Sequence, residues 1–107
     1  RKENDMKSFV YLICDPLTDT FKIGVTKRDV NERLKEIQTG NPGEVFILKV
    51  FESNYPYKLE SMLHRKFNSK KIINEWFALE SEDISSFMDI CLKYENIIKS
   101  LENQDWI

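Results

Sequence analysis

The stretch Ser8–Val25, with the sequence SFVYLICDPLTDTFKIGV, decides the fold of this chain. Its two ends, Ser8–Cys14 and Thr20–Val25, are rich in β-branched and aromatic residues, which favour β-strands. Between them, Asp15–Asp19 (DPLTD) has the composition of a turn. The stretch therefore predicts a β-hairpin, around which the rest of the fold must be built.

Helical and extended segments follow the hairpin. Val30, Leu34 and Ile37 recur at helical spacing and predict a helix over Asp29–Gln38. Glu44–Glu52 is a nearly continuous apolar run, which predicts a central, well-covered strand. Ser53–Pro56 offers a cap and an early proline for a second helix, which runs to about Phe67. The remaining segments are a basic loop over Asn68–Asn74, a short apolar piece over Trp76–Leu79 and a last helix that starts at Ser81–Asp83.

This order of segments predicts an α+β domain. We expect a small three-stranded antiparallel sheet flanked by helices, in the order β-β-α-β-α-(β)-α. The length of 107 residues fits one compact domain. We expect residues 1–7 to be a tag, a linker or a disordered start, residues 8–103 to form the single domain and residues 104–107 to be a tail.

Composition limits the class of protein. No run approaches the ~18 apolar residues that span a bilayer, and no secretory signal is visible. The two cysteines, Cys14 and Cys91, are too few for a disulfide framework, and their spacing fits no common zinc site. We therefore expect an intracellular, reducing compartment, either the cytoplasm or the interior of a host cell.

The net charge of −2 conceals an uneven distribution. Residues 1–74 carry 14 Lys and Arg against 10 Asp and Glu, whereas residues 75–107 carry 2 against 8. Within the first part, Tyr55–Lys71 holds a cluster of basic residues with Glu60 as its one acid. Most charge runs are only solvated helix faces, but this one also fits a basic surface that faces an anion, with the acidic last helix on the far side.

Three residues of the hairpin and one of the first helix are candidates for a site. Any hairpin register in which paired residue numbers sum to an odd value places Tyr11 and Lys22 on one face of the sheet. Gly24 within a strand indicates a close approach or a bulge; the plainer interpretation is a half-buried tyrosine and an extended lysine beside a bulge. Arg33 borders the apolar stripe of its helix, where it either pairs with a nearby glutamate or presents its planar donors to a phosphate.

The second helix adds Glu60 and His64. They are four residues apart and therefore neighbours on one helix face. Glu60 is either an ion-pair partner or a ligand of Mg²⁺, which commonly takes one or two carboxylates together with water and phosphate. His64 is weak evidence for catalysis, because a packed or capping histidine is more frequent than a catalytic one.

Together these residues resemble the GIY-YIG nuclease superfamily. Val10-Tyr11-Leu12 and Lys22-Ile23-Gly24 stand where that family has its two strand tripeptides, Arg33 matches its helix arginine, and Glu60 matches its single metal-binding glutamate. The segments KIGVTKRDVNERLKEIQTGNP, LESMLHRKF and NEWFAL are similar to the Lys-Ile-Gly branch found in phages and mobile elements and related to the fungal meiotically up-regulated family. The resemblance covers Phe9–Leu92.

The chain departs from the classical pattern at two positions. Lys22 replaces the second motif tyrosine, and Ile37 stands where classical members often have His or Tyr. Asn74 is a candidate for the late asparagine of the family. These departures keep open a non-catalytic nucleic-acid-binding module on the same fold. A third alternative is a protein-interaction or dimerisation domain that docks through the acidic last helix and residues 104–107.

The resemblance implies a divalent-metal-dependent endonuclease that hydrolyses DNA phosphodiester bonds at a single Mg²⁺ or Mn²⁺ ion held by Glu60. It implies catalytic roles for Tyr11, Lys22, Arg33, Glu60 and His64, with Gly24 as a structural residue of the motif. In it Tyr11 orients or deprotonates the attacking water, and Lys22 either lowers the pKa of Tyr11 or is itself the base. DNA is the expected partner, with an oligomer left open, and the phosphate contacts would come from Lys27, Arg28, Lys58, Arg65, Lys66, Lys70 and Lys71.

Overall fold

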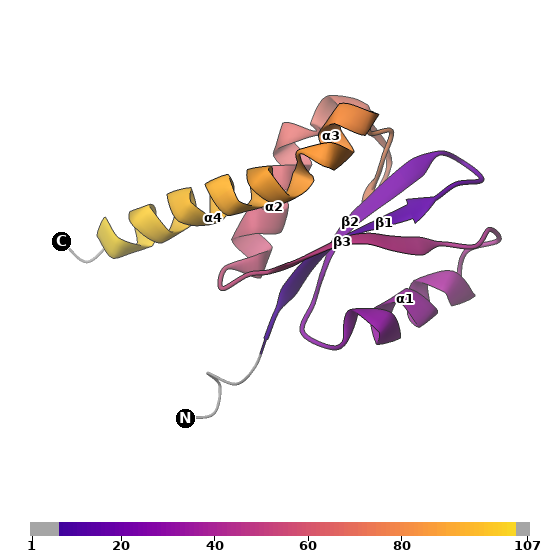
Figure 1. The fold of residues 1–107 in the computed structure, drawn as a ribbon, viewed down its shortest axis with the longest axis horizontal. Helices are drawn as coiled ribbons and strands as arrows, with labels where there is room; N and C mark the ends of the chain where they lie inside the picture. The colour runs from indigo at the N-terminus through magenta and orange to yellow at the C-terminus, as the bar shows by residue number, and fades with distance from the viewer. Residues whose placement is uncertain (1–6, 105–107) are drawn as a thin grey trace.

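The computed structural model describes residues 7–104 of the chain (Figure 1). The expected start and tail, residues 1–7 and 104–107, therefore lie almost entirely outside the described residues and stay predictions. None of the helices within residues 7–104 combines the length and the apolar composition that crossing a bilayer requires.

The predicted hairpin is present. It consists of β1 (Phe9–Asp15) and β2 (Thr20–Thr26), which pair antiparallel. The register places Tyr11 opposite Gly24 and Ile13 opposite Lys22, so the sum of paired numbers is odd and Tyr11, Lys22 and Gly24 share one face.

The sheet has five strands, so the expectation of three strands is wrong, although the α+β class holds. The strand order is β3-β1-β2-β5-β4, and all neighbours are antiparallel. The additional strands are β4 (Lys71–Ile73) and β5 (Trp76–Phe77), which lie in the segment predicted as a basic loop and a short apolar piece. They are too short to show strand periodicity. Asn74, at a φ of 52°, lies in the left-handed backbone region that asparagine tolerates, and it makes their tight connection.

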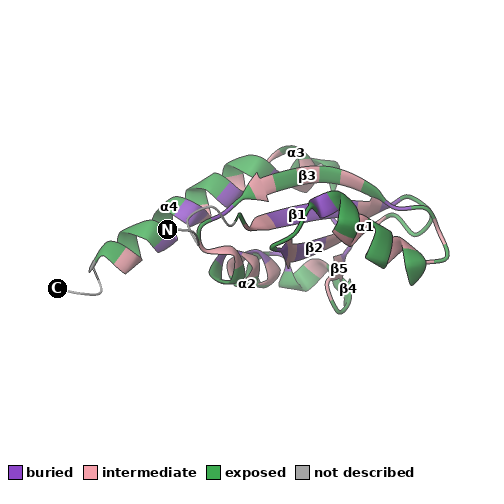
Figure 2. Ribbon diagram, turned by 90° about the horizontal axis from the view of Figure 1, so that it is seen from below, coloured by how far each residue is buried: buried purple, intermediate pink, exposed green. Residues whose placement is uncertain are grey.

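The strand β3 (Phe46–Glu52) lies at one edge of the sheet, so the expectation of a central, well-covered strand is also wrong. Phe46, Leu48 and Val50 are 45%, 40% and 37% exposed, and Figure 2 shows β3 mostly exposed beside the buried β1 and β2. A continuous apolar run predicts cover on both faces, but it carries no information about strand order.

Helices lie on both faces of the sheet (Figure 1). On one face, α1 (Val30–Thr39) begins after Asp29, whose side chain accepts a hydrogen bond from the backbone N–H of Asn31 at 2.9 Å. The other face carries α2 (Pro56–Lys66), α3 (Ser81–Ser85) and α4 (Phe87–Gln104), so the expected last helix is divided in two.

Each face of the sheet has its own core. The α1 side buries Tyr11, Ile13, Val30 and Val45, with Trp76 packed against them. The opposite side buries the larger cluster, formed by Val10, Leu12, Phe21, Ile23, Leu59, Leu63, Phe67, Phe77, Leu79, Phe87, Cys91 and Ile98.

The start of α2 is fixed to α4 by a buried polar contact. The carboxylate of Glu95 is 9% exposed and accepts hydrogen bonds from the Ser53 hydroxyl at 2.7 Å and from the backbone N–H of Asn54 at 2.8 Å. The Ser53 hydroxyl in turn accepts from the backbone N–H of Tyr55 at 2.9 Å. These bonds satisfy N–H groups that a helix start leaves free, and they set the position of the helix that carries Glu60.

Candidate active site

The phenol of Tyr11 lies directly over Gly24. A Cβ atom at residue 24 would stand 2.3 Å from the Tyr11 hydroxyl and 2.5 Å from its Cζ. Gly24 therefore leaves the space that the ring of Tyr11 fills, and the close approach expected from the sequence is made by the protein itself. The alternative of a bulge is not needed, because β1 and β2 pair without a shift in register.

Arg33 reaches Tyr11 from α1. Its Nε donates a hydrogen bond to the Tyr11 hydroxyl at 3.3 Å, and its Nη1 lies 2.8 Å from Glu36 Oε1. The side chain is 36% exposed, so part of the guanidinium stays open to solvent. Arg33 therefore pairs with a nearby glutamate, as one of the two interpretations of the sequence expected. Its guanidinium is also fixed by Tyr11, which suits it to bind an anion.

The Tyr11 phenol is fully buried. Burial raises its pKa above the ordinary value, and the hydrogen bond and positive charge of Arg33 oppose this only in part. The pKa of Tyr11 is therefore raised, whereas one of the two roles expected for Lys22 was to lower it. A buried, neutral phenol that accepts from Arg33 is suited to orient the arginine and unsuited to remove a proton from water.

Lys22 is held by two residues that follow Asn74. Its Nζ is 2.9 Å from Glu75 Oε1 and 5.6 Å from the centroid of the Trp76 ring. The lysine side chain is 14% exposed. Glu75 was missed in the sequence because it lies between the predicted loop over Asn68–Asn74 and the short apolar piece over Trp76–Leu79; the one signal that pointed there was the NEWFAL segment.

Glu60 projects from α2 near the Lys22–Glu75 ion pair of β2 and the β4–β5 turn. Its Oε2 lies 3.8 Å from His64 Nε2, and its side chain is 21% exposed. Burial raises the pKa of the Glu60 carboxyl and the negative charge of Glu75 raises it further, while the positive charges of His64 and Lys22 act in the opposite direction. Glu60 and Glu75 are therefore close enough to repel each other.

His64 connects α2 to β2. Its Nε2 lies 3.0 Å from the carbonyl oxygen of Ile23, and because a carbonyl only accepts, Nε2 donates in this contact. Its ring stands edge-on to Phe77, with centroids 5.0 Å apart. These contacts are those of a packed histidine, and they hold the helix turn that carries Glu60 against the strand.

Two shallow pockets adjoin at this edge. One is lined by Glu60, Ser61, His64, Lys71, Asn74 and Glu75. The other is lined by Lys22, Arg33, Glu36, Ile37, Gly40, Asn41 and Trp76. The Lys22–Glu75 ion pair joins the two pockets, of which one is lined by both Glu60 and Glu75 and the other by Arg33. The five residues predicted to be catalytic are brought together here from β1, β2, α1 and α2.

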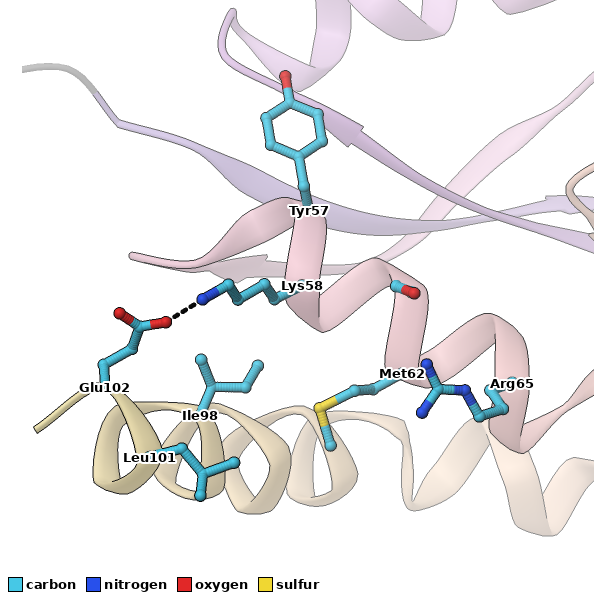
Figure 3. Close-up of a pocket in the computed structure, with 8 residues that line it drawn as sticks. Tyr57, Lys58, Met62, Arg65, Ile98, Leu101 and Glu102 are labelled. Atoms are coloured by element: carbon cyan, nitrogen blue, oxygen red, sulfur yellow. Dashed lines mark hydrogen bonds and ion pairs between the residues drawn. The ribbon is translucent and has the colours of Figure 1, made fainter. Parts of the chain in front are cut away.

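The basic residues predicted to bind DNA differ in their surroundings and in their distance from Glu60. Lys71 alone among them lines the pocket with Glu60. Lys58 and Arg65 line a groove between α2 and α4, where Lys58 pairs with Glu102 (Figure 3). The acidic α4 therefore packs against α2, and the expectation that it lies on the far side is wrong. The others are Arg28, 2.6 Å from Glu36; Lys70, 2.6 Å from Asp83; and Lys27 and Lys66, which lie over the rings of Tyr57 and Phe67.

A metal ion has few protein ligands available. Within residues 7–104, no group of three or more His, Cys, Asp and Glu side chains is placed to hold one. The donor set is then the partly buried carboxylate of Glu60, because the Glu75 carboxylate is paired with Lys22. This set fits a Mg²⁺ or Mn²⁺ ion whose remaining ligands are water and substrate phosphate, and it does not fit a closed structural site.

Comparison with known proteins finds one family. A family model described as the T5orf172 domain matches residues 8–92. This domain is phage-associated and nuclease-like. Neither the curated proteins nor the solved structures include a significant match to the chain. The matched span contains every residue of the two adjoining pockets.

Proposed function

The chain belongs to the T5orf172 domain family, and from this membership and the site we propose that it is a divalent-metal-dependent endonuclease that hydrolyses DNA phosphodiester bonds at a single-metal site of the GIY-YIG type. The observation that carries the proposal is the meeting of Tyr11, Lys22, Arg33 and Glu60, from four different elements, at one edge of β2. Structural packing alone does not require two cations and a carboxylate to line two pockets that are joined by an ion pair.

Glu60 is the proposed metal-holding residue. Its carboxylate is costly to keep ionised, because it is partly buried and repelled by Glu75, and a divalent cation would remove that cost. Such an ion, when bound, supplies polarisation of the scissile phosphate and stabilisation of the leaving oxygen. His64 contributes by fixing the helix turn on which Glu60 stands.

Arg33 and Lys22 are proposed to neutralise the charge that grows on the phosphate oxygens during cleavage. Both line the pocket beside the one that holds Glu60. Tyr11 acts on Arg33: its buried hydroxyl accepts from Nε and so fixes the guanidinium, part of which stays open to solvent. Donors fixed before the reaction stabilise such charge without having to reorganise. Lys71 is the residue proposed to position the strand through a phosphate contact.

The test is nicking of a supercoiled plasmid with Mg²⁺, Mn²⁺ or EDTA. We expect cleavage with either ion and none with EDTA. Glu60→Gln keeps the size of the side chain but removes its charge and replaces one acceptor oxygen by an NH2 group, so we expect cleavage to be abolished while DNA binding persists. Glu60→Ala should behave in the same way.

The matched control is Glu32→Gln, which neutralises an exposed glutamate that pairs with Lys35 on α1. Its cleavage rate should equal that of the unmodified chain. Undiminished cleavage by Glu60→Gln in the presence of metal contradicts the proposal. Salt-dependent DNA binding without any metal-dependent cleavage would favour the non-catalytic binding module instead.

A further inference from the structure

The segment Glu75–Trp76 contacts β2 through its backbone and Lys22 through its side chains. Trp76 pairs directly with Lys22 between β5 and β2, and the backbone N–H of Ile23 donates to the carbonyl oxygen of Glu75 at 3.2 Å. Directly opposed residues of an antiparallel pair present their side chains to the same face. The strand pairing therefore places the indole ring beside the lysine, while the backbone bond to Ile23 keeps Glu75 next to β2, where its carboxylate pairs with Lys22.

This arrangement restrains a side chain that is ordinarily mobile. A lysine on a strand surface extends its ammonium into water and keeps its rotamer freedom. Here the ammonium is 2.9 Å from Glu75 Oε1 and 5.6 Å from the ring centroid of Trp76, and the side chain is 14% exposed. Lys22 is thus held at the boundary between the pocket lined by Glu60 and Glu75 and the pocket lined by Arg33.

The place of Glu75 is unfavourable for a residue with only a structural role. Its carboxylate adds a negative charge beside Glu60 and Tyr11, and both groups are affected by it. An apolar residue before Trp76 would pair through its backbone equally well. What a carboxylate adds at this position is the contact with the ammonium of Lys22.

We propose that Glu75 is a positioning residue of the cleavage site, which together with the Trp76 ring fixes the ammonium of Lys22 where it meets the substrate phosphate. The inference rests on the proposed nuclease function for its consequence in catalysis, but the contact itself has a readout that does not depend on cleavage. Glu75 acts through Lys22, and not as a second ligand for the metal.

The first measurement is the proton NMR spectrum of the Lys22 side chain. The methylene protons near the Trp76 ring should be shifted upfield by its ring current. Glu75→Gln should move them towards the positions of a solvated lysine, and Trp76→Leu should remove the shift. Glu32→Gln, which disrupts the exposed pair with Lys35, should leave them unchanged. Lys22 resonances that are unaltered in Glu75→Gln would overturn the proposal.

The second measurement is a double-mutant cycle in the plasmid-nicking assay. A misplaced reacting group costs on the order of 100-fold in rate, so we expect Glu75→Gln to lower kcat by about that factor with little change in KM. In a Lys22→Met background, Glu75→Gln should have no further effect. A further loss in that background, with a raised Mg²⁺ requirement, would identify Glu75 as a metal ligand and overturn the proposal.

The two measurements separate this inference from the proposed function. If the unmodified chain does not cleave DNA, the nuclease proposal fails, and the NMR result still decides whether Glu75 holds Lys22. If the chain cleaves and Glu75→Gln cleaves equally well, the positioning role fails while the nuclease proposal stands.

Discussion

Gly24 and Tyr11 act as a pair, because the phenol ring occupies the space that any side chain at residue 24 would need. A Cβ there would stand 2.3 Å from the Tyr11 hydroxyl. The ring cannot withdraw easily, since Tyr11 is fully buried beside Ile13 and Val30. The smallest possible side chain at residue 24 would therefore displace the group that orients Arg33.

We expect Gly24→Ala to lower both stability and cleavage. Forcing a methyl group into a packed site typically costs 1–3 kcal/mol, and we expect a loss of about 2 kcal/mol in the free energy of unfolding. The matched control is Gly40→Ala, because a Cβ at residue 40 meets nothing within 4 Å and its φ of −94° suits alanine. Urea denaturation of both variants measures the difference. Equal stability of the two variants would show that the ring moves aside freely.

At the scale of single residues, the sequence predicted which residues form the candidate site but not which residues they contact. Gly24 indicated a close approach, and the odd-sum register correctly placed Tyr11 and Lys22 on one face. The identity of the approaching group depended on which residue lies opposite, and turn composition alone does not determine that. Glu75 was missed for a related reason: its contact with Lys22 exists only because β5 pairs with β2.

At the scale of helices and strands, the carboxylate of Asp15 connects the β1–β2 turn to the loop after α1 by hydrogen bonds. Asp15 is 4% exposed; it accepts hydrogen bonds from the backbone N–H of Leu17 at 3.0 Å and from the side-chain amide of Asn41 at 2.9 Å. The bond from Asn41 is the largest cause that holds the pKa of Asp15 below its ordinary value, although burial acts against it. The turn is thus stabilised by the ionised form of Asp15.

A pH-dependent stability follows from this lowered pKa. Asp15 binds a proton more readily in the unfolded chain than in the folded one, so its contribution is fully present above the ordinary aspartate pKa and is lost as the pH falls through the folded pKa. Hydrogen bonds to charged groups contribute about 1.5–3 kcal/mol, and we expect Asp15→Asn to lose an amount of that order at neutral pH. The loss should shrink as the pH falls below about 4.

Chemical denaturation at a series of pH values measures this difference. Asp19→Asn is the control, because Asp19 closes the same turn at a φ of 56°, where asparagine is equally tolerated, and its side chain is exposed. It should change stability by less than about 0.5 kcal/mol at every pH. A loss for Asp15→Asn that is constant from neutral to acid pH would exclude the ionised carboxylate as the cause.

The elements themselves divide into those with a local signal and those without one. The hairpin, α1 and α2 follow from turn residues, caps and helical periodicity, which act within a few residues of sequence. The edge position of β3 and the short strands β4 and β5 depend on strand order and on pairing between distant segments. Apolar content alone does not encode these properties, so the sheet was expected to be smaller than it is.

Across the whole molecule, acidic residues of the C-terminal part pair with lysines of the basic part. Lys58 of α2 pairs with Glu102 of α4, and Lys70 pairs with Asp83 of α3. The sequence does divide into a basic and an acidic part. In the structure, however, these two parts contact each other, and the acidic helix does not lie on the far side of the molecule. The basic side chains that remain at the candidate site are Lys22, Arg33 and Lys71.

This arrangement predicts which face of the molecule binds DNA. Each lysine that contacts a phosphate releases a counterion on binding, so its removal weakens binding to all sequences and lowers the slope of log affinity against log salt by about 0.9. We expect this result for Lys71→Ala, because Lys71 lines the pocket with Glu60. Lys58→Ala should change affinity and slope much less, since Lys58 lies in the groove between α2 and α4, paired with Glu102. Fluorescence anisotropy of a labelled duplex over a salt series, with EDTA to prevent cleavage, measures both quantities. A larger loss for Lys58→Ala than for Lys71→Ala would place the DNA on the α2–α4 side, where Glu60 does not reach, and would contradict the candidate active site.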